Sequence, residues 1–342
     1  MQINLKNFSF KTKGRRMAYT NLGRTIITGG AGFIGSHLVD KLCEKQVEVV
    51  VFDNLSAGRL KNVEKWLNSH NFKFVLGDLL HDFGKILESL KGCETVFHFA
   101  ANPEVRISSE NPKIHYEQNI AATFNLLEAV RKTDGVKTIV FASTSTVYGD
   151  SEEIPTPEDY GPLKPISIYG AAKLASEALM TSYAYNYGFK TVIYRLANIV
   201  GSRARHGVVY DFVRKLLENP KKLEILGDGT QKKSYLHIED CVDAILFGLN
   251  VARERVEIFN VGSEDQISVK EIADIVCMKM GLKGVQYMFT GGVDGGRGWK
   301  GDVKFMQLSI DKLKKLGWKP KLNSRQAVER AAEEILREEL KE

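Results

Sequence analysis

A glycine-rich segment near the start of the chain constrains the fold more than any other feature. Residues 24–28 form a short run rich in β-branched side chains, and Gly29, Gly32 and Gly35 follow in a G-x-x-G-x-x-G pattern. The pattern leads into residues 34–42, where apolar side chains recur at helical spacing. A strand, a tight glycine turn and a helix in this order are typical of dinucleotide-binding α/β sheets, because the turn lets a pyrophosphate approach the helix N-terminus.

An acidic residue at the end of the next apolar run strengthens this prediction. Residues 47–52 are rich in β-branched side chains and lead to Asp53, which lies 18 residues after Gly35. A carboxylate at the end of the second strand can accept hydrogen bonds from both hydroxyls of an adenosine ribose. Its charge also repels a 2′-phosphate, so Asp53 predicts NAD, while Arg59 keeps NADP as an alternative.

Apolar runs and amphipathic stretches then alternate along the chain. Further predicted strands cover residues 72–76, 95–99, 138–141 and 191–196, and helical patterns at 114–131 and 169–187 separate most of them. This alternation predicts an α/β fold with a doubly wound parallel sheet. We therefore expect a Rossmann-type domain at residues 23–197. The pattern loosens over residues 198–342, which predicts mainly a smaller second lobe from which the chain can cross back to the first domain.

Tyr169 and Lys173 form a second chemical signal. They are four residues apart in a predicted helix and so share one face, where the ammonium is expected to lower the pKa of the phenol from about 10. Ser143 and Thr144 end a predicted strand and supply a hydroxyl for the same substrate oxygen. The alternative is an ordinary surface helix, since this spacing also occurs by chance.

Net charge argues against a nucleic-acid partner. The formal net charge is +6, but residues 1–22 hold five of the 48 basic residues and no acidic one, which leaves 43 bases against 42 acids. A body this close to neutral has no electrostatic footprint for nucleic acid. We expect residues 1–22 to be an unstructured extension without function. A nucleic-acid arm, a targeting segment or a true start at Met17 are the alternatives.

Other residue types exclude further classes. The four cysteines are widely separated and form no C-x-x-C pair, so neither a disulfide framework nor a zinc ribbon is indicated. His98 lies in an apolar run and is expected to be an ordinary interior residue, and His206 and His237 have no carboxylate or second histidine at metal-ligand spacing, so no metal site is predicted. No apolar run reaches the roughly 18 residues that span a bilayer. We expect a cytoplasmic protein with no membrane partner.

Taken together, the motifs resemble the extended short-chain dehydrogenase/reductase family, and within it the 4-epimerases of UDP-hexoses. The resemblance is carried by T-G-G-A-G-F-I-G (28–35), F-D-N-L-S (52–56), G-D-L (77–79), H-F-A-A (98–101), Y-E-Q-N-I (116–120), S-T-S-T-V-Y-G (143–149) and Y-G-A-A-K (169–173). It implies a homodimeric NAD-dependent enzyme that inverts C4 of UDP-glucose or UDP-galactose through a transient 4-keto sugar.

The resemblance also implies a set of cofactor contacts. The glycine loop would contribute Gly29, Gly32, Phe33, Ile34 and Gly35; the adenosine side would contribute Asp53, Asn54, Ser56, Gly58, Asp78 and Leu79; the middle and the nicotinamide end would contribute Phe99, Ala100, Ala101, Asn119, Ser143, Tyr169, Lys173 and Leu196. For Asn119 the alternative is an ordinary helix residue that satisfies backbone groups.

For catalysis and the nucleotide sugar, the resemblance points to a smaller set. Thr144, Tyr169 and Lys173 would be catalytic, and Thr144, Asn198, Gln231, Lys233 and Arg297 would bind the substrate in a nucleotide-sugar-binding second lobe. Lys233 stands where many relatives have arginine, so a point charge replaces a bidentate phosphate contact.

The residues after Thr144 separate the chemistries known in this family. Ser145 and Thr146 stand where sugar 4,6-dehydratases carry an acid pair, and UDP-glucuronate decarboxylases commonly carry Glu at the position of Thr146. An epimerase needs no further acid or base there. Epimerisation of a UDP-N-acetylhexosamine or a UDP-uronic acid, or a non-catalytic NAD sensor, remain the alternatives.

Overall fold

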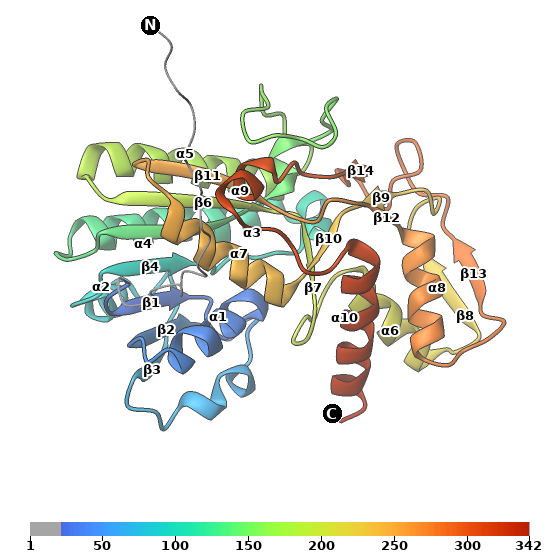
Figure 1. Ribbon diagram of the computed structural model, residues 1–342, viewed down its shortest axis with the longest axis horizontal. Helices are drawn as coiled ribbons and strands as arrows, with labels where there is room; N and C mark the ends of the chain where they lie inside the picture. The colour runs from blue at the N-terminus through green and yellow to red at the C-terminus, as the bar shows by residue number, and fades with distance from the viewer. Residues whose placement is uncertain (1–21, 342) are drawn as a thin grey trace, which may run out of the picture.

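The computed structural model describes residues 22–341, and its centre is a seven-stranded parallel sheet (Figure 1). The strand order is β11-β6-β5-β4-β1-β2-β3, which confirms the predicted doubly wound α/β fold. The extension predicted at residues 1–22 lies outside the described residues except for Leu22. The strands are β1 Thr25–Thr28, β2 Val49–Asp53, β3 Phe72–Leu76, β4 Thr95–His98, β5 Thr138–Thr144, β6 Lys190–Leu196 and β11 Val256–Val261.

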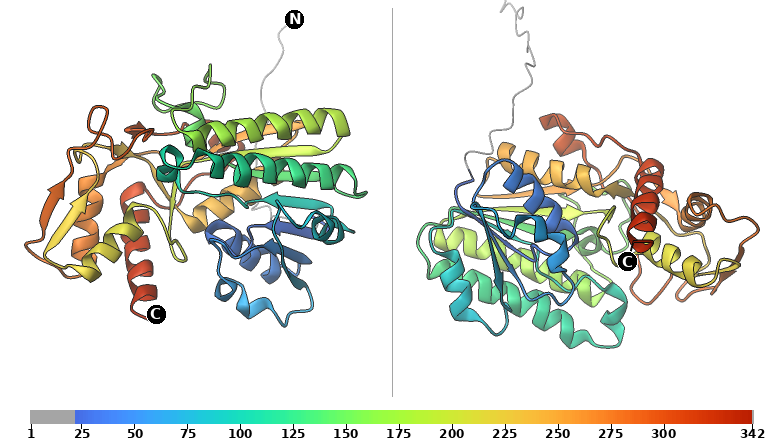
Figure 2. Two further views of the ribbon diagram at one scale, coloured as in Figure 1. Left: turned by 180° about the vertical axis from the view of Figure 1, so that it is seen from behind. Right: turned by 90° about the horizontal axis from the view of Figure 1, so that it is seen from below.

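Helices cover both faces of this sheet (Figure 2). Because successive strand residues point to opposite faces, Ile27 and Val51 pack toward α1 and α7, whereas Ile26 and Val50 pack toward α2, α4 and α5. Both members of each pair are almost fully buried, which is why the strands are continuous apolar runs. The helices are α1 Phe33–Glu44, α2 Phe83–Leu90, α4 Ala122–Arg131, α5 Ile168–Tyr187 and α7 Ile238–Val251.

A second lobe has its own apolar core, formed by α6, α8 and α10 with β8. Its helices are α6 Val208–Glu218, α8 Val269–Lys279 and α10 Ser324–Glu339. Its short strands are β7 Asn198–Val200, β8 Lys222–Ile225, β9 Lys232–Lys233, β10 Tyr235–His237, β12 Ile267–Ser268, β13 Gln286–Phe289 and β14 Phe305–Met306. They pair as β10-β7, β12-β9-β14 and β13-β8.

The chain passes between the two lobes more than once. After β10 it returns to the first domain, where α7 packs in the same core as α1 and β11 pairs with β6. Helix α9 (Asp311–Leu316) also adds Leu313 to that core. The remaining short elements are η2 Leu60–Asn62, η3 Glu64–Trp66, η4 Val105–Ser109, α3 Pro112–His115, η5 Tyr116–Ala121 and η6 Ser145–Tyr148. Within residues 22–341, no helix has the length and apolarity to cross a bilayer.

Candidate functional site

A cleft of about 490 Å³ lies between the sheet and the second lobe. On the sheet side its wall contains Gly29, Asp53 and Thr144, which follow or end β1, β2 and β5. On the other side it contains Asn198 and Lys233. Ligands of open α/β sheets bind outside the carboxyl ends of the strands, and this cleft has that position.

The glycine loop forms the floor of one end of the cleft. Gly29 has a φ of +70°, and a Cβ atom there would meet the Ala100 nitrogen at 2.6 Å. A Cβ atom on Gly35 would meet the Gly29 carbonyl oxygen at 2.2 Å. Helix α1 begins after Gly32, which supplies no side-chain cap. The first N–H groups of α1 therefore remain available to an anion, as a pyrophosphate site requires.

Asp53 is buried at the end of β2 and lines the cleft. One of its carboxylate oxygens accepts a hydrogen bond from the Ala31 nitrogen at 2.9 Å, and the other from the Leu55 nitrogen at 2.8 Å. Burial raises the pKa of Asp53, and these two hydrogen bonds oppose that rise. Each oxygen retains a further lone pair, so the carboxylate can still accept two ribose hydroxyls.

Most of the predicted cofactor contacts also lie in the cleft wall. They are Gly32, Phe33, Ile34, Gly35, Asn54, Ser56, Gly58, Asp78, Leu79, Phe99, Ala100, Ala101, Ser143, Tyr169, Lys173 and Leu196. Asn54 donates to the Asp78 carboxylate at 2.8 Å, which ties the end of β2 to the loop after β3. The adenosine side of the predicted site is therefore one connected surface.

Asn119 is the exception among these predicted contacts. It is buried behind the cleft wall, to which its neighbour Gln118 contributes instead. Its amide donates to the Asn102 carbonyl at 3.2 Å and accepts from the Asn102 nitrogen at 2.8 Å. The structure thus gives Asn119 the role named as the alternative, in which it satisfies the backbone of the loop after β4.

Thr144, Tyr169 and Lys173 come together at the sheet side of the cleft. Ser167 caps α5 by accepting from the Gly170 nitrogen at 3.0 Å, which places Tyr169 in the first helical turn. The phenol forms a hydrogen bond with the Thr144 hydroxyl. The Lys173 ammonium donates to the Ala142 carbonyl at 2.7 Å. Three side chains from a strand end and a helix thus converge on one end of the cleft.

Burial dominates the pKa values of this group. It raises the pKa of Tyr169 to about 12, against the effect of the Thr144 hydrogen bond, and lowers the pKa of Lys173 to about 7, against the effect of Glu177. The expected lowering of the phenol pKa by Lys173 is therefore wrong for this arrangement. The Tyr169 side chain is half-buried in the cleft wall, and the ammonium is directed at the Ala142 carbonyl, 4.6 Å from the centre of the Phe141 ring.

A buried ion pair lies next to β5, the strand that ends at Thr144. Arg195 of β6 and Glu177 of α5 are 2.8 Å apart, each with about 5% of the side chain exposed, and the Ser143 hydroxyl donates to Glu177. Sequence analysis did not single out this pair. The available signal was Arg195 itself, a charged residue inside the apolar run 191–196.

Three of the predicted substrate residues line the second-lobe side. Asn198 donates to the Ser234 carbonyl at 3.1 Å. Gln231 donates to the Leu226 carbonyl at 2.9 Å, and its Oε1 is buried with no hydrogen-bond partner among residues 22–341. Lys233 pairs with Asp302 at 2.6 Å. The wall of the cleft therefore contains both the Gln231 side chain, with this acceptor, and the Lys233 ammonium, which is bonded to Asp302.

Arg297 does not line the cleft, so its predicted direct contact with the substrate diphosphate is not supported. Its guanidinium forms two hydrogen bonds with Asp150, at 3.0 and 2.8 Å, and a third with the Asp302 carbonyl. The basic residues that do line the cleft, and that sequence analysis missed, are Arg106, Arg203, Arg205 and Lys215. The pair R-x-R at 203–205, directly after β7, was the signal for two of them.

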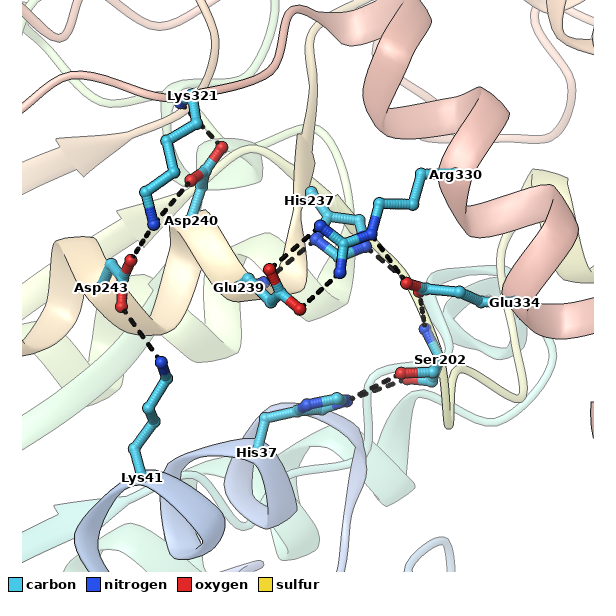
Figure 3. A network of polar contacts seen from close by, with 10 residues as sticks. All are labelled: His37, Lys41, Ser202, His237, Glu239, Asp240, Asp243, Lys321, Arg330 and Glu334. Atoms are coloured by element: carbon cyan, nitrogen blue, oxygen red, sulfur yellow. Dashed lines mark hydrogen bonds and ion pairs between the residues drawn. The ribbon is translucent and has the colours of Figure 1, made fainter. Parts of the chain in front are cut away.

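A polar network joins α1 and α7 of the first domain to α10 of the second lobe (Figure 3). His37 of α1 bonds to the Ser202 carbonyl at 3.1 Å, and Glu334 of α10 accepts from the Ser202 nitrogen at 2.9 Å. Burial lowers the pKa of His37 to about 4, so this ring is neutral near pH 7. The loop that carries Arg203 and Arg205 is thus fixed between the first domain and the second lobe.

In residues 22–341, no group of three or more metal-ligating side chains is placed to hold an ion.

Residues 25–262 match the family model described as the NAD dependent epimerase/dehydratase family. The chain belongs to this family. Its cofactor is therefore NAD, and the protein is an enzyme of the extended short-chain dehydrogenase/reductase type.

Individual relatives cover nearly the whole chain. A solved UDP-galactose 4-epimerase is 46% identical, with a TM-score of 0.81 over 92% of this chain and 99% of that one. The UDP-glucose 4-epimerase of Thermotoga maritima, solved with UDP-glucose, is 34% identical, with a TM-score of 0.80 over 93% and 99%. UDP-glucuronate 4-epimerase of Thermodesulfobacterium geofontis is 31% identical over 318 residues, which are 90% of this chain and 95% of that protein. All three relatives are named as UDP-sugar 4-epimerases, two for hexoses that differ only at C4 and one for a uronic acid.

The cleft of this epimerase/dehydratase family member fits NAD at the glycine loop and at Asp53. The glycine cradle has no room for side chains at Gly29 and Gly35 and leaves the start of α1 open for a pyrophosphate. The Asp53 carboxylate retains acceptor capacity for the adenosine ribose. NAD, when bound, supplies the hydride acceptor and the hydride donor of the reaction.

We expect Asp53→Asn to weaken NAD binding by roughly 10-fold or more, because the bonds lost are to a charged acceptor. The preference for NAD over NADP should narrow, because the charge that repels a 2′-phosphate is removed. The measurement is the Kd of each dinucleotide by calorimetry, with Glu64→Gln as the control for an exposed acid on η3. A variant with unchanged preference would contradict the role given to Asp53.

Proposed function

We propose that this enzyme interconverts UDP-glucose and UDP-galactose by inverting C4 of the hexose. The observation that carries the proposal is the convergence of Thr144, Tyr169 and Lys173, with Ser145 and Thr146 beside them in the cleft wall and no carboxylate on that segment. Such a site can exchange the proton of the sugar 4-hydroxyl, but it lacks an acid pair for the elimination of water.

Tyr169, Thr144 and Lys173 have different roles in the reaction. Tyr169 accepts the proton of the 4-hydroxyl as the phenolate, which is its minor form near pH 7 because burial raises the pKa to about 12. The Thr144 hydroxyl, whose hydrogen bond favours the phenolate, holds the same sugar oxygen. Lys173, fixed by the Ala142 carbonyl, places a positive charge one helical turn from Tyr169. The hydride leaves C4 and returns to its opposite face, so the sugar is first oxidised and then reduced and no cofactor is consumed. The 4-keto sugar must turn over between the two steps.

The second-lobe wall is suited to the nucleotide part of the substrate. Lys233 supplies a positive charge near the diphosphate, and Asn198 lies on the same wall. The Gln231 Oε1, which has no hydrogen-bond partner in the part of the chain that the structure describes, is an acceptor, so it suits an N–H or O–H group of the nucleoside better than a phosphate oxygen. Met306, also in the wall, is a flexible side chain that does not by itself select among C2 substituents.

The test begins with the purified protein and no added cofactor. After denaturation, mass spectrometry of the released nucleotide should show NAD, because a reduced cofactor has to stay bound until the keto sugar takes the hydride back. NMR of separate incubations with UDP-glucose, UDP-N-acetylglucosamine and UDP-glucuronate should then show inversion at C4 in the first. If only UDP-N-acetylglucosamine or only UDP-glucuronate is inverted, that sugar is the substrate. If none of the three is turned over, the alternative of a non-catalytic NAD sensor is favoured.

We also propose that the enzyme is a homodimer formed through α4 and α5. Phe124 and Tyr187 on these neighbouring helices are 45% and 50% exposed, and the rings of Phe124 and Tyr183 are in edge-to-face contact at 6.5 Å. Sedimentation at micromolar concentration should give a dimer. Phe124→Arg should give a monomer, because a charge would have to be desolvated at the interface. The control is Leu316→Arg, 44% exposed on α9, and a monomeric wild type would exclude this arrangement.

A further inference from the structure

The ion pair between Arg297 and Asp150 connects the two walls of the cleft. Asp150 lies two residues after η6, the short helix that Thr144 caps. Arg297 lies in the glycine-rich segment between β13 and β14 of the second lobe. Thr144 and Thr146 line one side of the cleft, and Trp299 and Asp302 line the other. The pair therefore joins the catalytic segment to the segment that faces it.

The pair is a bidentate ion pair that links the two segments, and it is called the tie below. Nη1 and Nη2 of Arg297 meet Oδ1 and Oδ2 of Asp150 at 3.0 and 2.8 Å, which is the bidentate arrangement of a guanidinium and a carboxylate. The Arg297 side chain is 20% exposed and the Asp150 side chain 47%, so the guanidinium is shielded from water and the carboxylate much less so. Three of the five N–H donors of Arg297 are taken by Asp150 and the Asp302 carbonyl.

Arg297 is also connected to the cation in the cleft. It donates to the carbonyl of Asp302, whose carboxylate accepts from Lys233 at 2.6 Å and from the Gly298 nitrogen at 3.0 Å. The Asp302 side chain is almost fully buried. A continuous path of hydrogen bonds therefore runs from Asp150 through Arg297 and Asp302 to the Lys233 ammonium.

The segment that carries Arg297 needs such a tie. Five of its glycines have positive φ values: Gly291, Gly292, Gly295, Gly296 and Gly301. Glycine-rich backbone loses much conformational freedom when it is fixed in one geometry. Gly301 also sits against the start of α5, where a Cβ atom would meet the Ile166 carbonyl at 2.8 Å. Movement of this segment would thus change the surroundings of Lys233, which pairs with Asp302 near its end.

We propose that Arg297 is a positioning residue whose pair with Asp150 holds the glycine-rich segment 291–302 against the catalytic segment and so sets the position of Lys233 in the substrate cleft. The effect on UDP-sugar turnover rests on the proposed function. The tie itself does not depend on the identity of the sugar.

The first experiment is a double-mutant cycle with Asp150→Asn and Arg297→Gln in the NAD-loaded enzyme. Each single variant should raise the KM for UDP-glucose roughly 5- to 10-fold, and the double variant should be no worse than either single one, because both remove the same contact. The kcat should change by less than about 2-fold, since neither residue touches the reacting atoms. If Arg297 instead bound the diphosphate directly, Asp150→Asn would leave the KM unchanged or lower it, and this outcome overturns the proposal.

Two measurements keep the test independent of turnover. Calorimetry with UDP should show the same pattern of affinity loss across the cycle. Hydrogen exchange of the amides in 291–302 should accelerate in Asp150→Asn but not in the controls Glu152→Gln, which neutralises an acid two residues away, and Arg325→Gln, which breaks an exposed pair on α10. If wild type turns over no UDP-sugar but the exchange rates change as expected, the proposed function fails and the tie stands. Unchanged exchange in Asp150→Asn overturns the tie.

Discussion

Tyr169→Phe is expected to lose at least ~10²-fold of its kcat for UDP-sugar epimerisation while it retains NAD. The substitution removes the only phenol bonded to Thr144 in the described cleft and keeps the ring, so the shape of the cleft is preserved. NAD should remain bound because Asp53 and the glycine cradle lie at the other end of the cofactor site. NMR of C4 inversion gives the kcat, and mass spectrometry after denaturation gives the NAD content.

The matched control is Tyr185→Phe, which removes a phenol from the exposed end of the same helix. It should match wild type in both turnover and thermal stability. Full activity in Tyr169→Phe would require another proton acceptor for the 4-hydroxyl. Loss of activity together with loss of NAD would show instead that Tyr169 mainly holds the cofactor.

The parts of the fold that sequence predicts are those fixed by local physics. The glycine turn before α1, the apolar runs of β1 and β2 and the position of Asp53 at a strand end all follow from residues that are close in the chain. Strand β11 does not. It joins β6 only after the chain has built β7 to β10 in the second lobe, and nothing in V-E-I-F-N-V specifies that pairing. The sequence allowed for a return of the chain to the first domain after residue 198, but it did not indicate which segment returns.

The same distinction applies to the site. Tyr169 and Lys173 share a helix face, and the spacing alone places them together. For the residues whose contacts the sequence did not predict, those contacts are set by partners far away in the chain. Arg297 bonds to Asp150, which is 147 residues away in the sequence, and Lys233 bonds to Asp302, which is 69 residues away. Neither partner can be derived from the spacing of residues in the sequence. The pKa of Tyr169 is a property of burial, which depends on the whole fold.

The buried ion pair of Arg195 and Glu177, next to β5, is the place where one substitution should cost the most stability. We expect Arg195→Met to lower the free energy of unfolding by about 3–5 kcal/mol, because Glu177 would be left charged and buried without its partner. The loss also removes donors to the Tyr148 hydroxyl and the Glu158 carbonyl. Urea unfolding followed by circular dichroism measures the change.

Two comparisons separate loss of the pair from loss of an arginine. Arg131→Met breaks an exposed pair with Glu128 on α4 and should cost no more than about 1 kcal/mol. The double variant Arg195→Met with Glu177→Leu should recover part of the stability, because no unpaired charge then remains buried. Since Ser143 donates to Glu177 and directly precedes Thr144, the single variant should also reduce kcat for UDP-sugar. If Arg195→Met were as stable as Arg131→Met, the pair would not support this end of β5, and the position of Thr144 would have to be set by its contacts in η6 alone.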